Sequence, residues 1–237
     1  MFRPRPAPLL AAVAAVCFAF SAHADETVSV GGVPAVLVKP GSAPVGSLIL
    51  LAGGDGHLGI GPNGAITQLK GNQLVRTRQA YANRGFAVLL PDANVDLAAA
   101  VKYMGGVARP VTVVGTSRGT QRAAEGIARG ARPDALVLTA GFLSQESGER
   151  VNRHVIALLG SPSSLPRTLV IHHREDACRH TLPAGVKPFL DWSKGKASVV
   201  WFDGGVNAGD PCQARAYHGF NGLDDKVVEA VVSFAKR

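Results

Sequence analysis

The sequence predicts an α/β protein built on a mostly parallel sheet of about eight strands, with helices on both faces. Short apolar segments alternate with helix-compatible segments through most of the chain. Several of the apolar segments are continuously hydrophobic, which is typical of strands covered on both faces. No linker, repeat or low-complexity tract divides residues 25–237, so we expect one domain over that range.

The first 24 residues have the pattern of a secretory signal peptide. Arg3 and Arg5 precede an apolar run over residues 9–20, and the segment ends in Ala22-His23-Ala24. We predict cleavage after Ala24 and a periplasmic or secreted protein. The run is shorter than the roughly 18 apolar residues of a membrane span, and no later segment approaches that length, so no stable membrane anchor is expected.

The amino-terminal half predicts a hairpin followed by two buried strands and one helix. Segments around Gly31-Gly32 form the antiparallel hairpin at a sheet edge. Residues 47–52, Ser-Leu-Ile-Leu-Leu-Ala, are continuously apolar and predict a central strand. The expected elements are the strands 27–30, 35–38 and 47–52, the helix 69–84 and the strand 86–90.

The carboxyl-terminal half repeats this alternation to the end of the chain. The expected strands are 111–115, 135–140, 168–173 and 198–203, and the expected helices are 95–104, 118–129, 150–159, 184–194 and 223–236. Strands and helices in this order predict parallel strand pairing. In such sheets ligands bind beyond the carboxyl ends of the strands, so candidate residues are sought there.

Charge and its distribution exclude one class of partner. The net charge is +8 for the full chain and +6 without Arg3 and Arg5. Basic residues are scattered and do not alternate with aromatic ones, so we expect no nucleic-acid binding. Attraction of an anionic substrate stays open.

The segment Gly115-Thr116-Ser117-Arg118-Gly119 is the first candidate site. It lies between an apolar strand and a helix-compatible segment, a context that predicts a strained strand-to-helix turn presenting the Ser117 hydroxyl. Glycines on both sides matter because side chains there would collide with the neighbouring strand and helix. A Gly-Ser turn that only connects two elements is the alternative.

A nucleophilic serine requires a base and a carboxylate that orients the base. Asp176, three residues after the strand 168–173, is the carboxylate candidate, and Glu175 and Asp203 are its competitors. His218 is the base candidate because it follows the last predicted strand and precedes the final helix. The resulting order Ser, Asp, His is the one that this architecture uses.

Two backbone N–H groups are expected to stabilise the oxyanion. The first is that of Arg118, which follows the serine. The second lies in the loop Gly53-Gly54-Asp55-Gly56-His57, after the strand 47–52; we choose Gly54, with Asp55 as the alternative. The loop lacks the Lys-Ser/Thr pair of a nucleotide-binding loop.

Two cysteines remain after removal of the signal peptide, Cys178 and Cys212. In an exported protein an even number favours a disulfide, which would tie the loop of Asp176 to the loop of His218. His172, His173, Cys178 and His180 suggest a metal site, but adjacent histidines on a strand point to opposite faces. We therefore expect no metal and no cofactor.

Taken together, these segments resemble the α/β-hydrolase superfamily over essentially the whole length after residue 24. The motifs that carry the resemblance are residues 50–54, 83–92, 115–119, 170–176 and 218–220. The resemblance implies Ser117 as nucleophile, His218 as general base and acid, Asp176 as its partner, and the Gly54 and Arg118 amides as oxyanion donors. Ala52 departs from the pattern, since many relatives have histidine there. Residues 140–168 leave room for one short helix and no substantial lid.

The expected function is an exported serine hydrolase that acts on a small-molecule acyl substrate, with a carboxylic ester as the first choice of bond. Hydrolysis of amides, peptides or thioesters by the same residues is an alternative. A non-catalytic binding protein on the same scaffold is another, because a fold does not guarantee chemistry.

Overall fold

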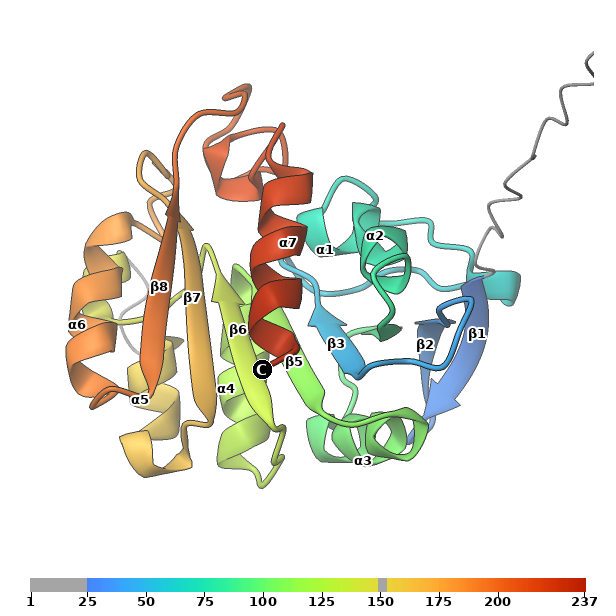
Figure 1. Ribbon diagram of the computed structural model, residues 1–237. Helices are drawn as coiled ribbons and strands as arrows, with labels where there is room; N and C mark the ends of the chain where they lie inside the picture. The colour runs from blue at the N-terminus through green and yellow to red at the C-terminus, as the bar shows by residue number, and fades with distance from the viewer. Residues whose placement is uncertain (1–24, 149–152) are drawn as a thin grey trace, which may run out of the picture.

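The computed structural model describes residues 25–148 and 153–237 and contains an eight-stranded sheet (Figure 1). The predicted signal peptide and residues 150–152 of the predicted helix 150–159 lie outside the described residues. The strands are β1 Asp25–Val30, β2 Val33–Val38, β3 Ser47–Leu51, β4 Ala87–Pro91, β5 Val111–Thr116, β6 Ala135–Thr139, β7 Arg167–His173 and β8 Ala197–Phe202.

The strand order is β1-β2-β4-β3-β5-β6-β7-β8. The hairpin β1–β2 is antiparallel, β2 is antiparallel to β4, and all further pairs are parallel. The α/β class, the edge hairpin and the mostly parallel sheet are therefore as predicted. Strands β3 to β6 are buried at every position, which accounts for their continuous hydrophobicity.

Helices cover both faces of this sheet; Figure 1 shows α7 in front of it and α4 behind it. One hydrophobic core forms between the sheet and helices α3 to α6, and a second forms between the sheet and α1, α2 and α7. The helices are α1 Gln73–Arg76, α2 Arg78–Ala82, α3 Leu97–Val107, α4 Arg118–Ala128, α5 Val155–Leu159, α6 Val186–Trp192 and α7 Asp224–Ala235.

The predicted helix 69–84 is replaced by two short helices, α1 and α2. Leu69 has a φ of 51°, and the helical conformation begins only after Asn72. At Thr77 the backbone leaves the helical region, with φ −99° and ψ 1°. The Thr77 hydroxyl donates to the Gln73 carbonyl at 2.7 Å, a local bond that competes with a continuous helix.

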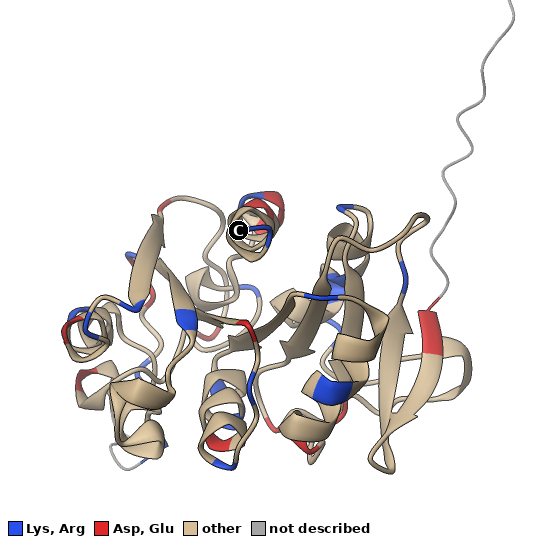
Figure 2. Ribbon diagram, turned by 60° about the horizontal axis from the view of Figure 1, so that its bottom comes forward, with Lys and Arg blue, Asp and Glu red and all other residues tan. Residues whose placement is uncertain are grey.

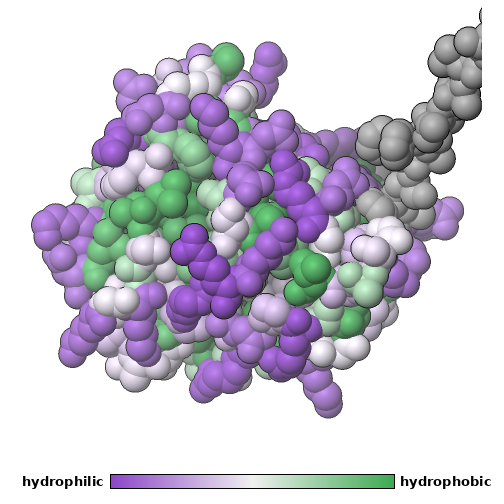
Figure 3. All heavy atoms as spheres, in the orientation of Figure 1, coloured by the Kyte–Doolittle hydropathy of each residue, from purple (hydrophilic) through white to green (hydrophobic). Residues whose placement is uncertain are grey.

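The surface carries both signs of charge. Figure 2 shows acidic and basic segments interspersed over the helices and loops. In Figure 3 a hydrophobic patch interrupts the hydrophilic face where β8 lies beside α7, and Val200, Phe202 and Ala230 line a shallow groove there. Within the described part of the chain, no helix has both the length and the hydrophobicity needed to cross a bilayer.

Candidate active site

Ser117 lies in a strained turn between β5 and α4, with φ 52° and ψ −122°. Its N–H donates to the Thr139 carbonyl at 3.0 Å, and its carbonyl accepts from the Thr120 N–H at 2.9 Å. A Cβ on Gly119 would lie 2.0 Å from the Leu51 carbonyl oxygen, and one on Gly115 would lie 2.7 Å from the Gly119 oxygen. Only glycine fits at both positions, so the turn depends on the spacing of the motif.

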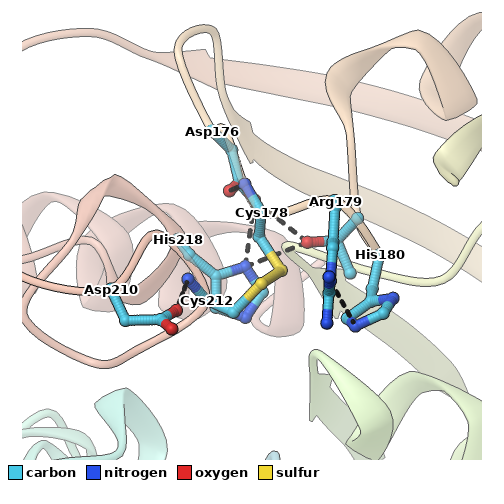
Figure 4. Close-up of a disulfide and its surroundings, with 8 residues drawn as sticks. Asp176, Cys178, Arg179, His180, Asp210, Cys212 and His218 are labelled. Atoms are coloured by element: carbon cyan, nitrogen blue, oxygen red, sulfur yellow. Dashed lines mark hydrogen bonds and ion pairs between the residues drawn. A yellow bond between two sulfur atoms is a disulfide. The ribbon is translucent and has the colours of Figure 1, made fainter.

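Asp176 and His218 meet at the carboxyl end of β7 (Figure 4). The Nδ1 atom of His218 lies 3.0 Å from Asp176 Oδ2, and the side chains are 7% and 0% exposed. The second carboxylate oxygen, Oδ1, accepts from the Cys178 N–H at 2.9 Å. Because Asp176 accepts the Nδ1 proton of the neutral ring, Nε2 is left as the proton acceptor.

The competing carboxylates lie elsewhere. Asp203 is 66% exposed and pairs with Arg174 at 3.3 Å. Glu175 is exposed as well. Of the three acids considered from the sequence, all within the described residues, Asp176 alone contacts the His218 ring.

Thr181 is a buried neighbour of this pair that the sequence did not reveal. Its hydroxyl lies 3.2 Å from Asp176 Oδ2 and 3.0 Å from His218 Nδ1. The side chain is completely buried. A threonine in a loop after a strand forms no motif that predicts a catalytic neighbour. Its closeness in sequence to Asp176, five residues earlier, is the one feature that points to the site.

Ser117 and His218 line the same pocket, which has a volume of about 320 Å³. Both proposed oxyanion residues, Gly54 and Arg118, also line it, whereas Asp176 lies behind His218. Among the described residues, no aspartate or glutamate lines the pocket. The lining residues are Gly53, Gly54, Leu69, Gly71, Asn72, Gln73, Thr116, Ser117, Arg118, Phe142, Cys178, His180, Cys212, Gln213, Ala214, His218 and Gly219.

A disulfide between Cys178 and Cys212 joins the loop after β7 to the loop before His218 (Figure 4). His173 connects the same two loops by another route. Its Nδ1 accepts from the Glu175 N–H at 3.1 Å, its Nε2 donates to the Gly204 carbonyl at 2.9 Å, and its ring stacks on Tyr217. The two connections limit how far the Asp176 loop and the His218 loop can separate.

The two remaining members of the suggested metal cluster, His172 and His180, make other contacts. His180 stacks on the Phe142 ring. The His172 ring is buried and its Nδ1 donates to the His173 carbonyl at 3.0 Å. Burial lowers the pKa of His172, so the ring is neutral near pH 7. In residues 25–148 and 153–237, no three histidine, cysteine, aspartate or glutamate side chains form a group able to hold a metal ion.

Arg122 on α4 binds the backbone carbonyls of the loop that follows β3. One guanidinium nitrogen donates to the Ala52 carbonyl and lies 3.5 Å from the Gly53 oxygen, and the other lies 3.3 Å from the Gly54 oxygen. Burial lowers the pKa of Arg122, and the positive charge of Arg118 lowers it further. Sequence analysis missed Arg122, since an arginine inside an amphipathic helix is normally a solvated residue.

Comparison with known proteins identifies the fold. No protein-family model matches the sequence, and no curated protein matches it either. Solved structures do match. The esterase domain of a Rhodothermus marinus protein has a TM-score of 0.63 at 14% identity over 90% of this chain and 97% of its own. An esterase from Exiguobacterium antarcticum has a TM-score of 0.59 at 12% identity, covering 90% and 99%. A Pyrococcus furiosus esterase has a TM-score of 0.61 at 14% identity, covering 91% of each chain.

The chain has the α/β-hydrolase fold. At identities this low the likeness concerns the fold and leaves the activity to be argued from the site. In this α/β-hydrolase fold, the part of the segment between β6 and β7 that the structure describes holds the five-residue helix α5 and two short 3₁₀ turns. The pocket of Ser117 lies at the carboxyl ends of β3 and β5, where this architecture binds ligands.

Proposed function

We propose that the protein is an exported serine hydrolase that cleaves carboxylic esters through an acyl-enzyme. The observation that carries the proposal is the arrangement of Ser117 and His218 in one pocket, with the buried carboxylate of Asp176 3.0 Å behind the imidazole. A hydroxyl, an imidazole and a carboxylate in this order are the requirements of seryl nucleophilic catalysis.

The reaction proceeds in two halves. Ser117 Oγ attacks the ester carbonyl carbon while His218 Nε2 takes its proton, and Asp176 stabilises the imidazolium that results. The N–H groups of Arg118 and Gly54 donate to the oxyanion. The tetrahedral intermediate expels the alcohol, which takes the proton from His218. Water then attacks the acyl carbon with His218 as base, and the carboxylic acid leaves as Ser117 regains its proton.

Several observations favour an ester and an exported enzyme. Proteins described as esterases share the fold over about nine-tenths of this chain. A disulfide beside the site is the kind of bond that persists in an oxidising compartment. The amino-terminal segment has the signal-peptide pattern. Periplasmic or secreted location and a small-molecule acyl substrate are parts of the same proposal.

The test uses protein beginning at Asp25 and a panel of chromogenic esters of increasing acyl length, with an anilide and a thioester alongside. Wild-type protein should hydrolyse at least one ester and should be labelled at Ser117 by a fluorophosphonate probe. Ser117→Ala should lower turnover by more than about 10⁴-fold and abolish labelling. Wild-type turnover in Ser117→Ala overturns the proposal. Absence of both turnover and labelling in wild-type protein indicates a binding protein instead.

A further inference from the structure

Asn72 has a side-chain amide whose orientation is determined by the helix that it precedes. Its Oδ1 accepts from the Leu74 N–H at 3.1 Å, which caps α1. Because the partner is a backbone donor, the atom facing it must be the oxygen. The Nδ2 group therefore points away from the helix. Among the residues described by the structure, none accepts a hydrogen bond from it.

The Nδ2 group lies near the nucleophile, on the same side of Gly53 as Ser117. A Cβ on Gly53 would lie 3.2 Å from Asn72 Nδ2 and 3.2 Å from Ser117 Cβ. One point is thus in close contact with both groups, and all three residues line the same pocket. The Nδ2 atom and the Ser117 Cβ are therefore at most 6.4 Å apart, twice 3.2 Å. A carbonyl carbon bonded to Ser117 Oγ can place its oxygen between them, within the roughly 2.7–3.2 Å of an N–H···O bond to Nδ2.

We propose that Asn72 is a further catalytic residue, which donates an Nδ2 hydrogen to the oxyanion of the tetrahedral intermediate formed on Ser117. The inference rests on the proposed function and extends it, because the oxyanion site then has one side-chain donor beside the two backbone N–H groups. A neutral donor already oriented before the reaction needs no reorganisation as charge develops on the carbonyl oxygen. The bond from Oδ1 to Leu74 supplies that orientation.

The alternative is that Asn72 only caps α1, and the two roles use different atoms. Capping requires an acceptor at Oδ1, and aspartate and serine cap helices about as well as asparagine. Oxyanion stabilisation requires the donor at Nδ2. Asn72→Asp keeps the acceptor and replaces the donor by a charged oxygen, whereas Asn72→Ser keeps an acceptor and removes the donor.

The experiment compares both variants with wild type in the esterase assay, in thermal unfolding and in inhibition by phenylboronic acid, which forms a tetrahedral adduct on a reactive serine. Loss of one oxyanion donor typically lowers kcat by about 10²–10³-fold. We expect a loss of this order for Asn72→Ser and a larger one for Asn72→Asp, whose charge opposes the oxyanion. The KM should change by less than about threefold, because the donor acts mainly in the transition state. Boronic acid affinity should fall together with kcat.

A cap elsewhere in the molecule provides the matched control. Asp96 accepts from the Ala99 N–H at 2.8 Å at the start of α3, so Asp96→Ser exchanges a cap away from the pocket. Its kcat should equal that of wild type, and all three variants should unfold within a few degrees of wild type, since each keeps a capping acceptor.

The outcomes separate this inference from the proposed function. A folded Asn72→Ser with kcat and boronic acid affinity within about threefold of wild type overturns the inference, while loss of turnover in Ser117→Ala leaves the proposed function intact. If Ser117→Ala keeps its activity, the proposed function itself fails. If Asn72→Ser loses kcat because it does not fold, the decision passes to Asn72→Asp. The inference stands if Asn72→Asp folds and still loses kcat, and it is rejected otherwise.

Discussion

Two oxygen atoms lie next to Nδ1 of the His218 ring, which carries only one proton to donate. Asp176 Oδ2 and Thr181 Oγ1 both lie 3.0 Å from Nδ1, and they lie 3.2 Å from each other. The Thr181 hydroxyl donates its own hydrogen to the carboxylate, and its oxygen shares the Nδ1 proton. Each polar group in this buried triangle therefore has a partner, and the ring has two contacts that resist rotation.

We predict that Thr181→Val lowers kcat by about ten- to a hundred-fold, because hydrogen bonds to a charged group contribute about 1.5–3 kcal/mol. Valine keeps the shape of threonine but removes a donor to the buried carboxylate, so the protein should stay folded with an unfolding temperature lower by several degrees. The KM should stay near the wild-type value, since Thr181 is completely buried and does not line the pocket. Steady-state kinetics over several esters measures both constants. Thr181→Ser should recover most of the activity, and a Val variant with wild-type kcat would contradict the positioning role.

At this scale the sequence predicts residues whose position follows from chain order. Ser117, Asp176 and His218 each follow a strand of a parallel sheet, and the carboxyl ends of such strands meet at one edge. Thr181 and Asn72 have no such rule, because their contacts depend on how irregular loops fold back on the strands. Residue type alone does not distinguish them from solvated loop residues.

Between elements, the loop after β3 depends on helix α4 for its conformation. The Arg122 guanidinium contacts the carbonyl oxygens of Ala52, Gly53 and Gly54 on one side of the loop. Gly53 and Gly54 of the same loop line the Ser117 pocket. The nucleophile turn and the proposed oxyanion loop are therefore joined through the helix that begins at Arg118.

We predict that Arg122→Met lowers the free energy of unfolding by about 1–3 kcal/mol, since it leaves partly buried carbonyl groups without a donor. Methionine retains much of the apolar stem. The kcat should fall as well, with little change in KM, because the loop amides lose their fixed direction. Urea unfolding and steady-state kinetics check the two effects.

Arg129 provides the control for this prediction. It has the same charge, caps the far end of α4 and is exposed, so Arg129→Met should change neither the stability nor kcat appreciably. Arg122→Lys should fall between wild type and Arg122→Met, because an ammonium group can reach fewer of the carbonyls at once. Equal effects at 122 and 129 would show that charge, and not the contact with the loop, is responsible.

The element that the sequence predicted least well is the helix over residues 69–84. Apolar spacing reports which face of a segment is buried, and Leu74 and Tyr81 do face the same core in α1 and α2. It does not report whether the backbone is continuous. The left-handed Leu69 and the break at Thr77 arise from local hydrogen bonds and loop closure, which override helical propensity.

Across the whole molecule, the order of elements along the chain predicted a mostly parallel sheet. The order of the strands within that sheet depends on long-range pairing. Parallel strands separated by helices follow from the alternation along the chain. The position of β4 between β2 and β3 does not, since it depends on which strands pair across the sheet. The same pairing leaves β7 beside β8, so the disulfide and His173 join loops at the ends of neighbouring strands.

The buried His172 links the stability of the whole fold to pH. Its surroundings are the carboxylate of Asp176, the imidazole of His218 and the Trp201 ring. Burial is the largest influence and lowers the pKa of His172 below its ordinary value of 6.5, the charge of His218 lowers it further, and Asp176 opposes the shift. Hydrogen bonds to the backbone of His173 and Thr181 favour the protonated ring, as Asp176 does, but together they do not offset the cost of burying the charge, so the pKa stays lowered.

We predict that the free energy of unfolding falls as the pH is lowered below about 6.5, because the unfolded chain binds a proton at His172 that the folded chain does not. One such proton gives a slope of up to about 1.4 kcal/mol per pH unit between the unfolded and folded pKa values. Urea unfolding at pH 7.5, 6.5 and 5.5 measures this slope.

The variant His172→Asn tests whether His172 is responsible. It keeps a side-chain N–H donor but does not titrate, so it should be less stable at pH 7.5 and its free energy of unfolding should depend less on pH over this range. His154, whose pKa is also lowered by burial, contributes equally to both proteins, so the difference between the two slopes isolates His172. Parallel slopes would mean that His172 is protonated in the folded state as readily as in the unfolded one.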